Sequence, residues 1–376
     1  MAVRSYTRVE GNEQIVSAET GASPEPEPEP EPEPARTPRR SRSAPTIYDI
    51  AKAADVSPST VSRALNKPGR INFKTEQRVQ AAAKELNYRH NPMARALPTG
   101  RMQTLGLLIA DITNPMFFNV VRGAQREAFQ RGYTLVLADS QESDLREAEA
   151  AERVAPFVDG LILVTTRLND DQIRKLAEWK PLVVINRKVD GVDGVLPDIT
   201  PGVDEALVHL SGLGHQSLAF LSGPANSWMS RARRETLFRN APEHGMAIVE
   251  IGPGVPTLEG GREVLTQVLA SGATAVLAYN DLMAIGLMRA AQQHGLVVPD
   301  RLSIIGFDDI FGSDFTSPPL STIRTPLDRI GERAVWRALE LVEGREGSPP
   351  PERHELALAT ELVVRGSTGL ASRVFI

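Results

Sequence analysis

Residues 57–66 combine hydroxyl, proline and arginine side chains at the expected start of a helix. Ser57 can cap this helix, and Pro58 suits its first position, where a missing backbone N–H loses no hydrogen bond. Short polar side chains and arginine near a helix N-terminus can bond to phosphate oxygens and to base edges. The expected chemistry is contact with DNA, in which Pro58, Ser59 and Arg63 face base edges and Thr60, Ser62 and Asn66 face phosphates.

The charge around this helix is basic, although the chain as a whole is acidic. All 376 residues together carry a formal net charge of −5. Residues 45–102, in contrast, contain ten lysines and arginines against four acidic residues, a net charge of +6. Affinity for nucleic acid follows the local potential, because each phosphate contact releases a counterion. An ordinary solvated helical surface could carry the same charge. The charge alone therefore does not distinguish DNA binding from a plain surface, and the residue motif has to decide between them.

Three short helices are expected to position these side chains. Thr46 and Asp49 can cap the first helix, the second ends before Lys67, and the third covers residues 74–86. Apolar residues recur at helical spacing in each: Ile47, Ile50, Ala51 and Ala54; Val61, Ala64 and Leu65; Val79, Ala82, Ala83 and Leu86. Two helices joined by a tight turn and followed by a third predict a helix-turn-helix, whose second helix enters the major groove.

The first 44 residues are expected to form no compact structure. Residues 24–34 alternate proline and glutamate, a pattern that favours extended polyproline II and cannot bury a core. A basic cluster follows, made of Arg36, Arg39, Arg40 and Arg42. We interpret this extension as a solvated spacer; an alternative is that the basic cluster touches DNA phosphates.

Beyond Gly100 the pattern changes to buried strands that alternate with amphipathic helices. Strands are expected at residues 104–109, 134–138, 161–164, 182–185, 217–221, 275–278 and 302–306, and a helix at 117–131. This alternation predicts an α/β fold with parallel sheets covered by helices on both faces. Two sheets are expected, divided near residues 198–203, and ligands of such folds bind at the carboxyl ends of the strands.

The composition narrows the functional class further. Cysteine is absent, so a disulfide framework and a thiolate metal site are both excluded. No run of 18 apolar residues occurs, and the N-terminus lacks the apolar core of a signal peptide. We therefore expect a cytoplasmic protein that has no membrane partner and needs no cofactor or metal.

Five segments of the helical region match a known pattern at uninterrupted spacing. They are Ile47-Tyr48-Asp49-Ile50-Ala51, Val56-Ser57, Thr60-Val61-Ser62-Arg63-Ala64-Leu65-Asn66, Glu85-Leu86-Asn87-Tyr88 and Asn91-Pro92-Met93-Ala94-Arg95-Ala96-Leu97. Together they resemble the DNA-binding headpiece of the lactose/galactose repressor (LacI/GalR) family. The resemblance implies a transcription regulator, and it adds as candidate DNA contacts Tyr48, Ser57, Arg70, Tyr88, Asn91 and Ala94.

The same resemblance implies a special role for residues 91–97. In the family this segment is a hinge helix that folds only on operator DNA, and Leu97 matches the leucine that enters the minor groove and kinks it. A helix of seven residues is unstable alone, so coupling its folding to DNA is physically reasonable, and Pro98 must end it. The alternative is a plain linker with Leu97 packed on the core.

The rest of the chain resembles the family's regulatory core, which is similar to periplasmic sugar-binding proteins. The matching segments are residues 111–118, 213–215, 221–224, 280–286, 305–309 and 318–323, the last as a strand near the crossing between subdomains. The resemblance places the polar ligand positions at Arg233, Asn280 and Asp308. Met116 and Phe117 would face the ligand from the first subdomain.

Three more effector candidates depart from the family pattern or are less specific. Asn186 stands where many relatives carry Asp, Leu327 stands where an aromatic residue is common, and Trp228 could stack on a sugar face or pack in the core.

Structural roles remain open for the polar candidates as well. Asp308 and Asp309 could bridge local backbone, and Asn280 could simply cap the next helix. The neighbouring arginines 231 and 234 leave the register of Arg233 uncertain.

These observations predict a division of the chain into four parts. Residues 1–44 form the extension, 45–90 the headpiece, 91–102 the hinge and linker, and 103–376 the effector-binding and dimerisation core. Within the core, the N-subdomain would contain about 103–198 and 326–357, and the C-subdomain about 201–323 and 359–366.

The resemblance implies a homodimer on a pseudo-palindromic operator, controlled by a small molecule, most simply a mono- or oligosaccharide. Ligand would close the cleft between subdomains and either separate the hinges (induction) or bring them together (corepression); a phosphoprotein corepressor is a variant. No leucine heptad follows Arg365, so a dimer is expected over a tetramer.

Two rival functions fit parts of the sequence. An enzyme is disfavoured because G-x-G-x-x-G after a strand and a phosphate-binding P-loop are both missing from the sequence. A transport-associated sugar receptor would explain residues 103–366, but not the headpiece.

Overall fold

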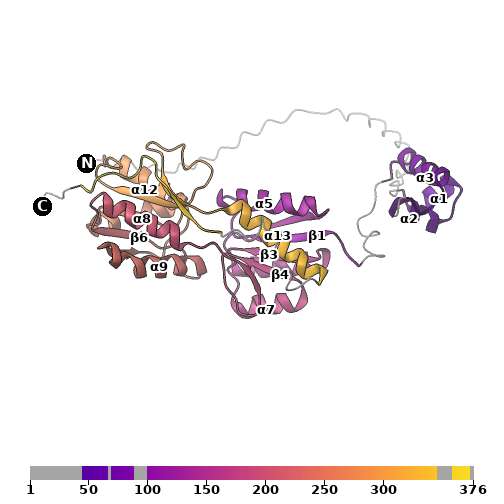
Figure 1. Ribbon diagram of the computed structural model, residues 1–376, viewed down its shortest axis with the longest axis horizontal. Helices are drawn as coiled ribbons and strands as arrows, with labels where there is room; N and C mark the ends of the chain where they lie inside the picture. The colour runs from indigo at the N-terminus through magenta and orange to yellow at the C-terminus, as the bar shows by residue number, and fades with distance from the viewer. Residues whose placement is uncertain (1–44, 67–68, 89–99, 345–357, 373–376) are drawn as a thin grey trace, which may run out of the picture. The chain divides into compact units, whose positions relative to one another are not determined.

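The computed structural model describes residues 45–66, 69–88, 100–344 and 358–372. These residues divide into two compact units, one within 1–89 and one within 90–376. Figure 1 shows the helical unit and the α/β unit, in which the two sheets occupy separate lobes. The predicted extension at 1–44 and the predicted hinge helix at 91–97 lie outside the described residues.

The helical unit contains three helices around a small apolar core. They are α1 (Ile47–Ala54), α2 (Pro58–Asn66) and α3 (Phe73–Glu85). The predicted capping box of α1 is present, since Asp49 accepts hydrogen bonds from the backbone and side chain of Thr46. Ile50, Val61 and Val79 each have no exposed surface, so one residue from every helix closes the core. The predicted helix-turn-helix is confirmed.

The first lobe of the α/β unit is built on a parallel five-stranded sheet. The strand order is β2-β1-β3-β4-β5, and the strands are β1 (Thr104–Ile109), β2 (Thr134–Asp139), β3 (Gly160–Val164), β4 (Leu182–Ile185) and β5 (Asp193–Val195). Every residue of β3 and β4 is buried, as expected for strands covered on both faces. Its own helices are α5 (Met116–Gln130), α6 (Asp144–Val154) and α7 (Asp170–Trp179), with the short η1 (Ala155–Phe157).

The second lobe contains a six-stranded sheet of order β11-β10-β9-β8-β6-β7. Its strands are β6 (Ser217–Leu221), β7 (Ala247–Ile251), β8 (Ala275–Ala278), β9 (Ser303–Asp308), β10 (Ser321–Arg324) and β11 (Glu361–Val363). Only β11 is antiparallel to its neighbour. The helices are α8 (Thr200–Gly212), α9 (Trp228–Asn240), η2 (Ala241–His244), α10 (Leu258–Glu263), α11 (Leu265–Ala270) and α12 (Asp281–Gln293).

The chain crosses between the lobes more than once. It leaves the first sheet after β5, and it returns from β10 through α13 (Leu327–Glu343), which packs on α5. Gly123 and Gly331 allow this contact, because a Cβ on either would lie about 2 Å from the carbonyl oxygen of the facing helix. A third segment leads into β11, so both lobes are assembled from separated parts of the sequence.

The predicted α/β class with two parallel sheets is confirmed. The structure adds β5, β7 and β11, which the sequence did not predict: β5 and β11 have three residues each, and β7 is an edge strand with mostly exposed side chains. Such strands carry little hydrophobic pattern. In the part of the chain that the structure describes, no helix has the length and apolar character needed to cross a membrane.

Candidate DNA-reading helix and effector pocket

Helix α2 separates its apolar face from its polar face. Val61 and Ala64 are buried against α1 and α3, whereas Ser59 and Arg63 are exposed. The hydroxyl of Ser57 caps the helix by accepting a hydrogen bond from the backbone N–H of Thr60 at 3.2 Å. The same oxygen lies 2.9 Å from the hydroxyls of Ser59 and Thr60, so these side chains form one polar cluster at the helix start.

The remaining DNA candidates differ in how accessible they are. Tyr48 has 69% of its surface exposed and Arg70 is exposed, whereas Pro58, Ser62 and Tyr88 are half-buried. Asn91, Ala94 and Leu97 lie outside the described residues, as does the side chain of Asn66. Contact with DNA therefore stays a prediction for all of these residues.

The α/β unit brings six of the eight effector candidates into one pocket between its lobes. Met116, Phe117, Asn186, Arg233, Asn280 and Asp308 line it, together with Asn114, Glu142, Thr165, Arg167, Met229, Pro256 and Tyr279. Most of the polar residues follow the carboxyl ends of β1 to β4, β8 and β9, where ligands of such sheets bind. The cavity volume is about 20 Å³, room for roughly one water molecule, so a sugar requires the walls to separate.

A buried ion pair forms the centre of this pocket. Nη2 of Arg233 donates to Oδ1 of Asp308 at 2.8 Å, and Nη1 donates to the carbonyl oxygen of Tyr279. The guanidinium carbon lies 3.6 Å from the centre of the Phe307 ring and 5.0 Å from that of Tyr279, both close enough for cation–π attraction. Asp308 and Arg233 are each about 4% exposed. A planar cation against aromatic rings beside a carboxylate is suited to binding hydroxyl groups.

Burial and pairing act in opposite directions on the Asp308 carboxyl. Burial raises its pKa, and the positive charge and hydrogen bond of Arg233 lower it again, but the net shift is upward. The residue also has φ of +106°, a conformation that few side chains adopt. Strained backbone of this kind often occurs at functional sites, since the surrounding structure has to hold it.

Two amide side chains complete the polar wall. Asn280 caps α12 by accepting from the N–H of Met283 at 2.9 Å, and it donates to the carbonyl of Pro256 at 3.0 Å. The cap interpretation is therefore confirmed, although Asn280 also lines the pocket. Asn186 has φ of +63° and donates to Thr165 at 3.3 Å, while its buried Oδ1 has no hydrogen-bond partner among the described residues. That oxygen is a free acceptor for a ligand hydroxyl.

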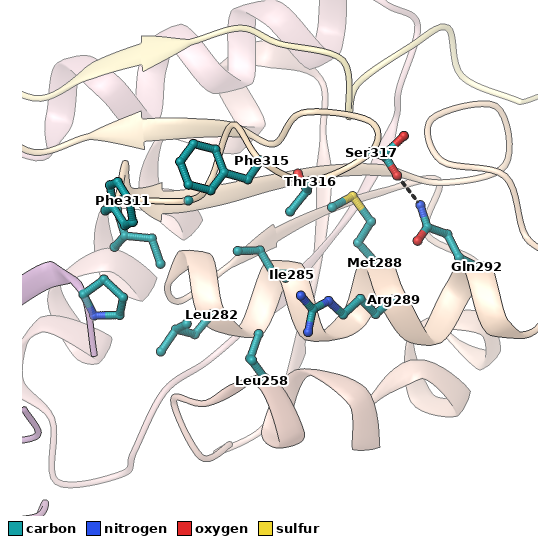
Figure 2. Close-up of a pocket in the computed structure, with 13 residues that line it drawn as sticks. Leu258, Leu282, Ile285, Met288, Arg289, Gln292, Phe311, Phe315, Thr316 and Ser317 are labelled. Atoms are coloured by element: carbon teal, nitrogen blue, oxygen red, sulfur yellow. Dashed lines mark hydrogen bonds between the residues drawn. The ribbon is translucent and has the colours of Figure 1, made fainter. Parts of the chain in front are cut away.

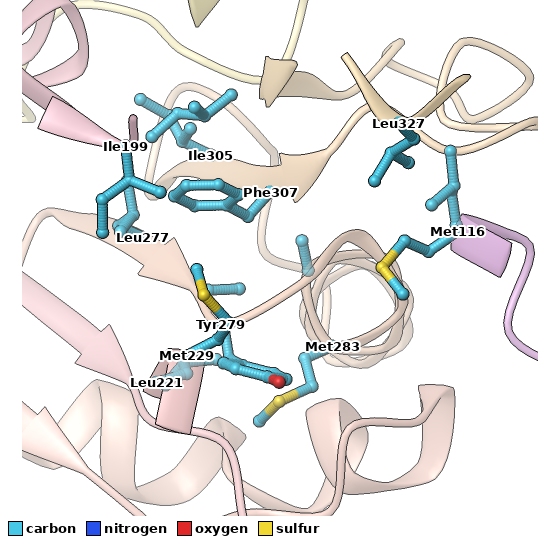
Figure 3. Close-up of a cluster of buried hydrophobic side chains, with 14 of the residues drawn as sticks. Met116, Ile199, Leu221, Met229, Leu277, Tyr279, Met283, Ile305, Phe307 and Leu327 are labelled. Atoms are coloured by element: carbon cyan, nitrogen blue, oxygen red, sulfur yellow. The ribbon is translucent and has the colours of Figure 1, made fainter. Parts of the chain in front are cut away.

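The structure settles the register of the arginine cluster. Arg233 is buried in the pocket, whereas Arg231 is exposed and Arg234 pairs with Glu250 at 2.6 Å outside it. Two other candidates do not line the pocket. Trp228 lies one position before Met229 on α9, so the helical rotation directs Met229 to the pocket and packs Trp228 on the core. Leu327 begins α13 and is buried in the apolar cluster that contains Met116 and Phe307 (Figure 3).

Sequence reasoning missed a second charged pair in the pocket. Nε of Arg167 donates to Oε2 of Glu142 at 2.6 Å, and Nη1 donates to the carbonyl of Thr165 at 3.1 Å. Arg167 and Glu142 follow β3 and β2 in loops without a periodic pattern. Their position directly after buried strands was the available signal, because side chains there reach the ligand edge of the sheet.

The second lobe, together with Pro115 of the first, also forms an open and mostly apolar groove with a volume of about 490 Å³. Figure 2 shows that α12 forms one side through Leu282, Ile285 and Met288, and that Phe311 and Phe315 stand on the other. The two rings meet edge to face with centres 5.0 Å apart, and about 70% of each residue is exposed. An exposed apolar patch with paired aromatic rings is typical of a protein contact surface.

Among the residues that the structure describes, no three His, Asp or Glu side chains are grouped so that they could hold a metal ion.

Two families match separate parts of the chain. Residues 46–91 match "Bacterial regulatory proteins, lacI family", and residues 207–368 match "Periplasmic binding protein-like domain". The first range covers the three helices, and the second covers most of the lobe that contributes Arg233, Asn280 and Asp308.

Related proteins and solved structures match most of the chain. The ribose operon repressor of Escherichia coli (strain K12) is 33% identical over 332 residues, which are 86% of this chain and 99% of that protein. The lac repressor dimer bound to operator and an anti-inducer superimposes with a TM-score of 0.77 at 28% identity, covering 87% and 100% of the two chains. A ribose-bound LacI family regulator from Enterococcus faecium has a TM-score of 0.61 at 30% identity, covering 71% and 98%.

Proposed function

The chain belongs to the lacI family of bacterial regulatory proteins, and from this premise we propose that it represses transcription under the control of a sugar. The observation that carries the effector half of the proposal is the pocket itself. Two charged pairs, four neutral polar side chains and two aromatic rings converge there between the lobes. Because each guanidinium already faces a carboxylate, the pocket suits an uncharged polyhydroxyl ligand better than an anion.

The DNA-reading half rests on α2. Its exposed Ser59 and Arg63 and its half-buried Pro58 face away from the core, as the second helix of a helix-turn-helix requires. We assign Arg63 to a base edge, since arginine bonds guanine with two parallel hydrogen bonds. The hydroxyl side chains Thr60 and Ser62, with Asn66, would contact phosphates and fix the register. Tyr48, Ser57, Arg70 and Tyr88 would support them.

We assign a different role to each part of the chain. Residues 45–90 bind the major groove, 91–102 form the hinge with Leu97 in the minor groove, and 103–376 bind the effector and the second subunit. We propose that the protein acts in the cytoplasm, where bacterial DNA lies. Sugar binding would change the angle between the lobes and thereby the spacing of two hinges in the dimer.

The apolar groove of Figure 2 is the surface that we assign to the homodimer. A second copy of the chain would cover the exposed Phe311 and Phe315, as the dimeric state of the similar lac repressor suggests. Replacing both phenylalanines by serine is expected to shift the mass measured by light scattering from a dimer toward a monomer. A mass of four chains in the unchanged protein would contradict the dimer.

The test of the function is an operator titration with and without sugars. Fluorescence anisotropy with the DNA upstream of the protein's own gene measures affinity at fixed salt, because phosphate contacts make affinity salt-dependent. D-Ribose is the first probe, followed by other pentoses, hexoses and disaccharides. An Arg63→Ala variant serves as the control for sequence-specific binding.

Each result has a distinct meaning. Specific binding that one sugar weakens establishes an inducer-controlled repressor, and binding that needs a sugar establishes corepression. Specific binding that no sugar changes would remove the sugar from the proposal. No specific binding to any fragment would contradict the assignment of α2 as the reading helix.

A further inference from the structure

The segments that cross between the lobes are hydrogen-bonded to one another. Asp198 donates its N–H to the carbonyl of Leu358 at 2.9 Å, and Thr360 donates back to the carbonyl of Asp198 at 2.9 Å. The third crossing segment begins at Arg324, the last residue of β10, and enters α13 at Leu327. A change of the angle between the lobes has to bend these segments, because they are the covalent links in the described part of the core.

Asp309 connects the start of one crossing segment, and a residue beyond β11 in the same lobe, to the effector pocket. Its Oδ2 accepts from Nε of Arg324 at 2.7 Å, and its Oδ1 accepts from Nη2 of Arg365 at 2.7 Å. Arg324 ends β10, and Arg365 follows β11. The residue before Asp309 is Asp308, which holds Arg233 in the pocket. One turn of the chain therefore carries a pocket carboxylate and an anchor for the crossing strands.

The surroundings of Asp309 show that this anchor is held firmly. Ser313 donates to Oδ1 at 3.0 Å, and Arg365 also donates to the carbonyl of Leu320 at 2.7 Å. Asp309 has φ of +54°, so the turn is held in the left-handed region. Burial raises the pKa of its carboxyl, but the hydrogen bonds from Arg324 and Arg365 outweigh it, and the net shift is downward. The carboxylate stays ionised and paired at neutral pH.

Arg324 extends the cluster outward to the last crossing segment. Its Nη1 donates to Oε1 of Glu361 at 2.9 Å, on the first residue of β11. The side chains of Arg324 and Glu361 are 46% and 59% exposed, so this outer pair is screened and weak. Asp309 and Arg365 are only 11% and 18% exposed, so breaking this inner pair costs more, because a mostly buried charge is left without its partner. We name Asp309, Arg324, Glu361 and Arg365 the crossing cluster.

We propose that Asp309 is a positioning residue that couples the effector pocket to the angle between the lobes, through the crossing cluster. A ligand that hydrogen-bonds to Asp308 moves the turn formed by Asp308 and Asp309. Asp309 transmits that movement to Arg324 at the end of β10 and to Arg365 after β11. The cluster lies within the second lobe, where it fixes the end of β10 and the start of β11, and without a ligand it thereby limits how far the adjoining crossing segments bend. The coupling deepens the proposed effector control, but its test needs neither effector nor DNA.

The absence of cysteine from the chain makes a direct distance measurement possible. Asp144→Cys, at the exposed first residue of α6, and Asn226→Cys, in the exposed loop before α9, give one spin-label pair across the pocket in the full-length protein. Double electron–electron resonance then measures the distribution of lobe separations. The test variants are Asp309→Ala and Arg324→Gln. The matched control is Arg234→Gln, which breaks an ion pair of the same lobe away from the crossing segments; the two arginines are equally exposed (48% against 46%).

Breaking the crossing cluster should increase the fraction of molecules in which the two lobes are farther apart. We expect Arg324→Gln to raise the population of separated lobes by about two- to fivefold, the range of a partly exposed pair. Asp309→Ala should raise it further, since it releases Arg365 as well. Glu361→Gln should have the smallest effect, and Arg234→Gln should match the parent.

The proposal is wrong if Asp309→Ala and Arg324→Gln give the same distribution as Arg234→Gln. Circular dichroism checks that each variant folds. If Asp309→Ala does not fold, Arg324→Gln decides alone, because its side chain is half exposed and its removal leaves no buried charge without a partner. Operator binding that fails while the distances respond would contradict the proposed function and leave the coupling supported.

Discussion

The reading helix and the effector pocket place their chemistry in opposite positions relative to the core. On α2 the polar candidates lie on the outside, while the buried Val61 and Ala64 pack into the core of the headpiece. In the pocket, Arg233 and Asp308 are buried, and their contacts to each other and to backbone also hold the lobe together. Recognition and stability are thus separable in the first region and joined in the second. Mutations in the two regions should show this difference.

The largest effect is expected from Asp308→Ala in the pocket. It leaves the Arg233 cation buried without its carboxylate, which should lower the free energy of unfolding by about 3–5 kcal/mol. The effector response should disappear, while operator binding by the intact fraction is retained. Urea unfolding and the operator titration measure the two consequences. Asp308→Asn is the control of similar size, and an effector response that survives Asp308→Ala would show that the pocket is assigned wrongly.

Arg63→Ala in α2 should have the opposite effects: weaker operator binding and nearly unchanged stability. Operator binding should weaken by about 1–3 kcal/mol and base preference should relax at one position. The stability of the headpiece should hardly change, since the Arg63 side chain is exposed. Anisotropy on operators with single base changes, together with thermal unfolding, tests both statements. An unchanged base preference would remove Arg63 from the reading residues.

Ile50→Val tests whether the headpiece core affects DNA binding only through folding. Ile50 is fully buried, so the change should cost about 0.5–1.5 kcal/mol of stability. Operator affinity should fall only near the unfolding temperature, and base preference should stay the same. Melting curves and anisotropy at two temperatures measure this. A changed base preference at low temperature would break the separation of stability and recognition in this region.

Arg234→Gln should have the smallest effect, although the residue is next to Arg233. Its pair with Glu250 is half exposed and lies outside the pocket, so stability and effector response should match the parent protein. The comparison variant Arg233→Gln should lose the effector response. The comparison uses the same operator titration, and loss of response in Arg234→Gln would place the pocket boundary elsewhere.

The sequence by itself determined the headpiece in detail. Thr46 and Ser57 cap helices where the predicted helices begin, and the apolar residues that close the core recur at helical spacing. Local hydrogen bonds and short-range periodicity decide these features, so they can be read along the chain. The buried strands, such as β1 and β4, were predictable for the same reason.

Only the tertiary structure decided how the pocket is assembled. Arg233 and Asp308 are 75 residues apart, and their contact depends on the packing of α9 against the end of β9. The rotation of α9 directs Met229 to the pocket in place of Trp228, and the loops after β2 and β3 of the other lobe bring the unpredicted Glu142 and Arg167 into its wall. These placements depend on helix rotation and on where loops meet after parallel strands. Both are consequences of long-range packing, which the local pattern of residues does not contain.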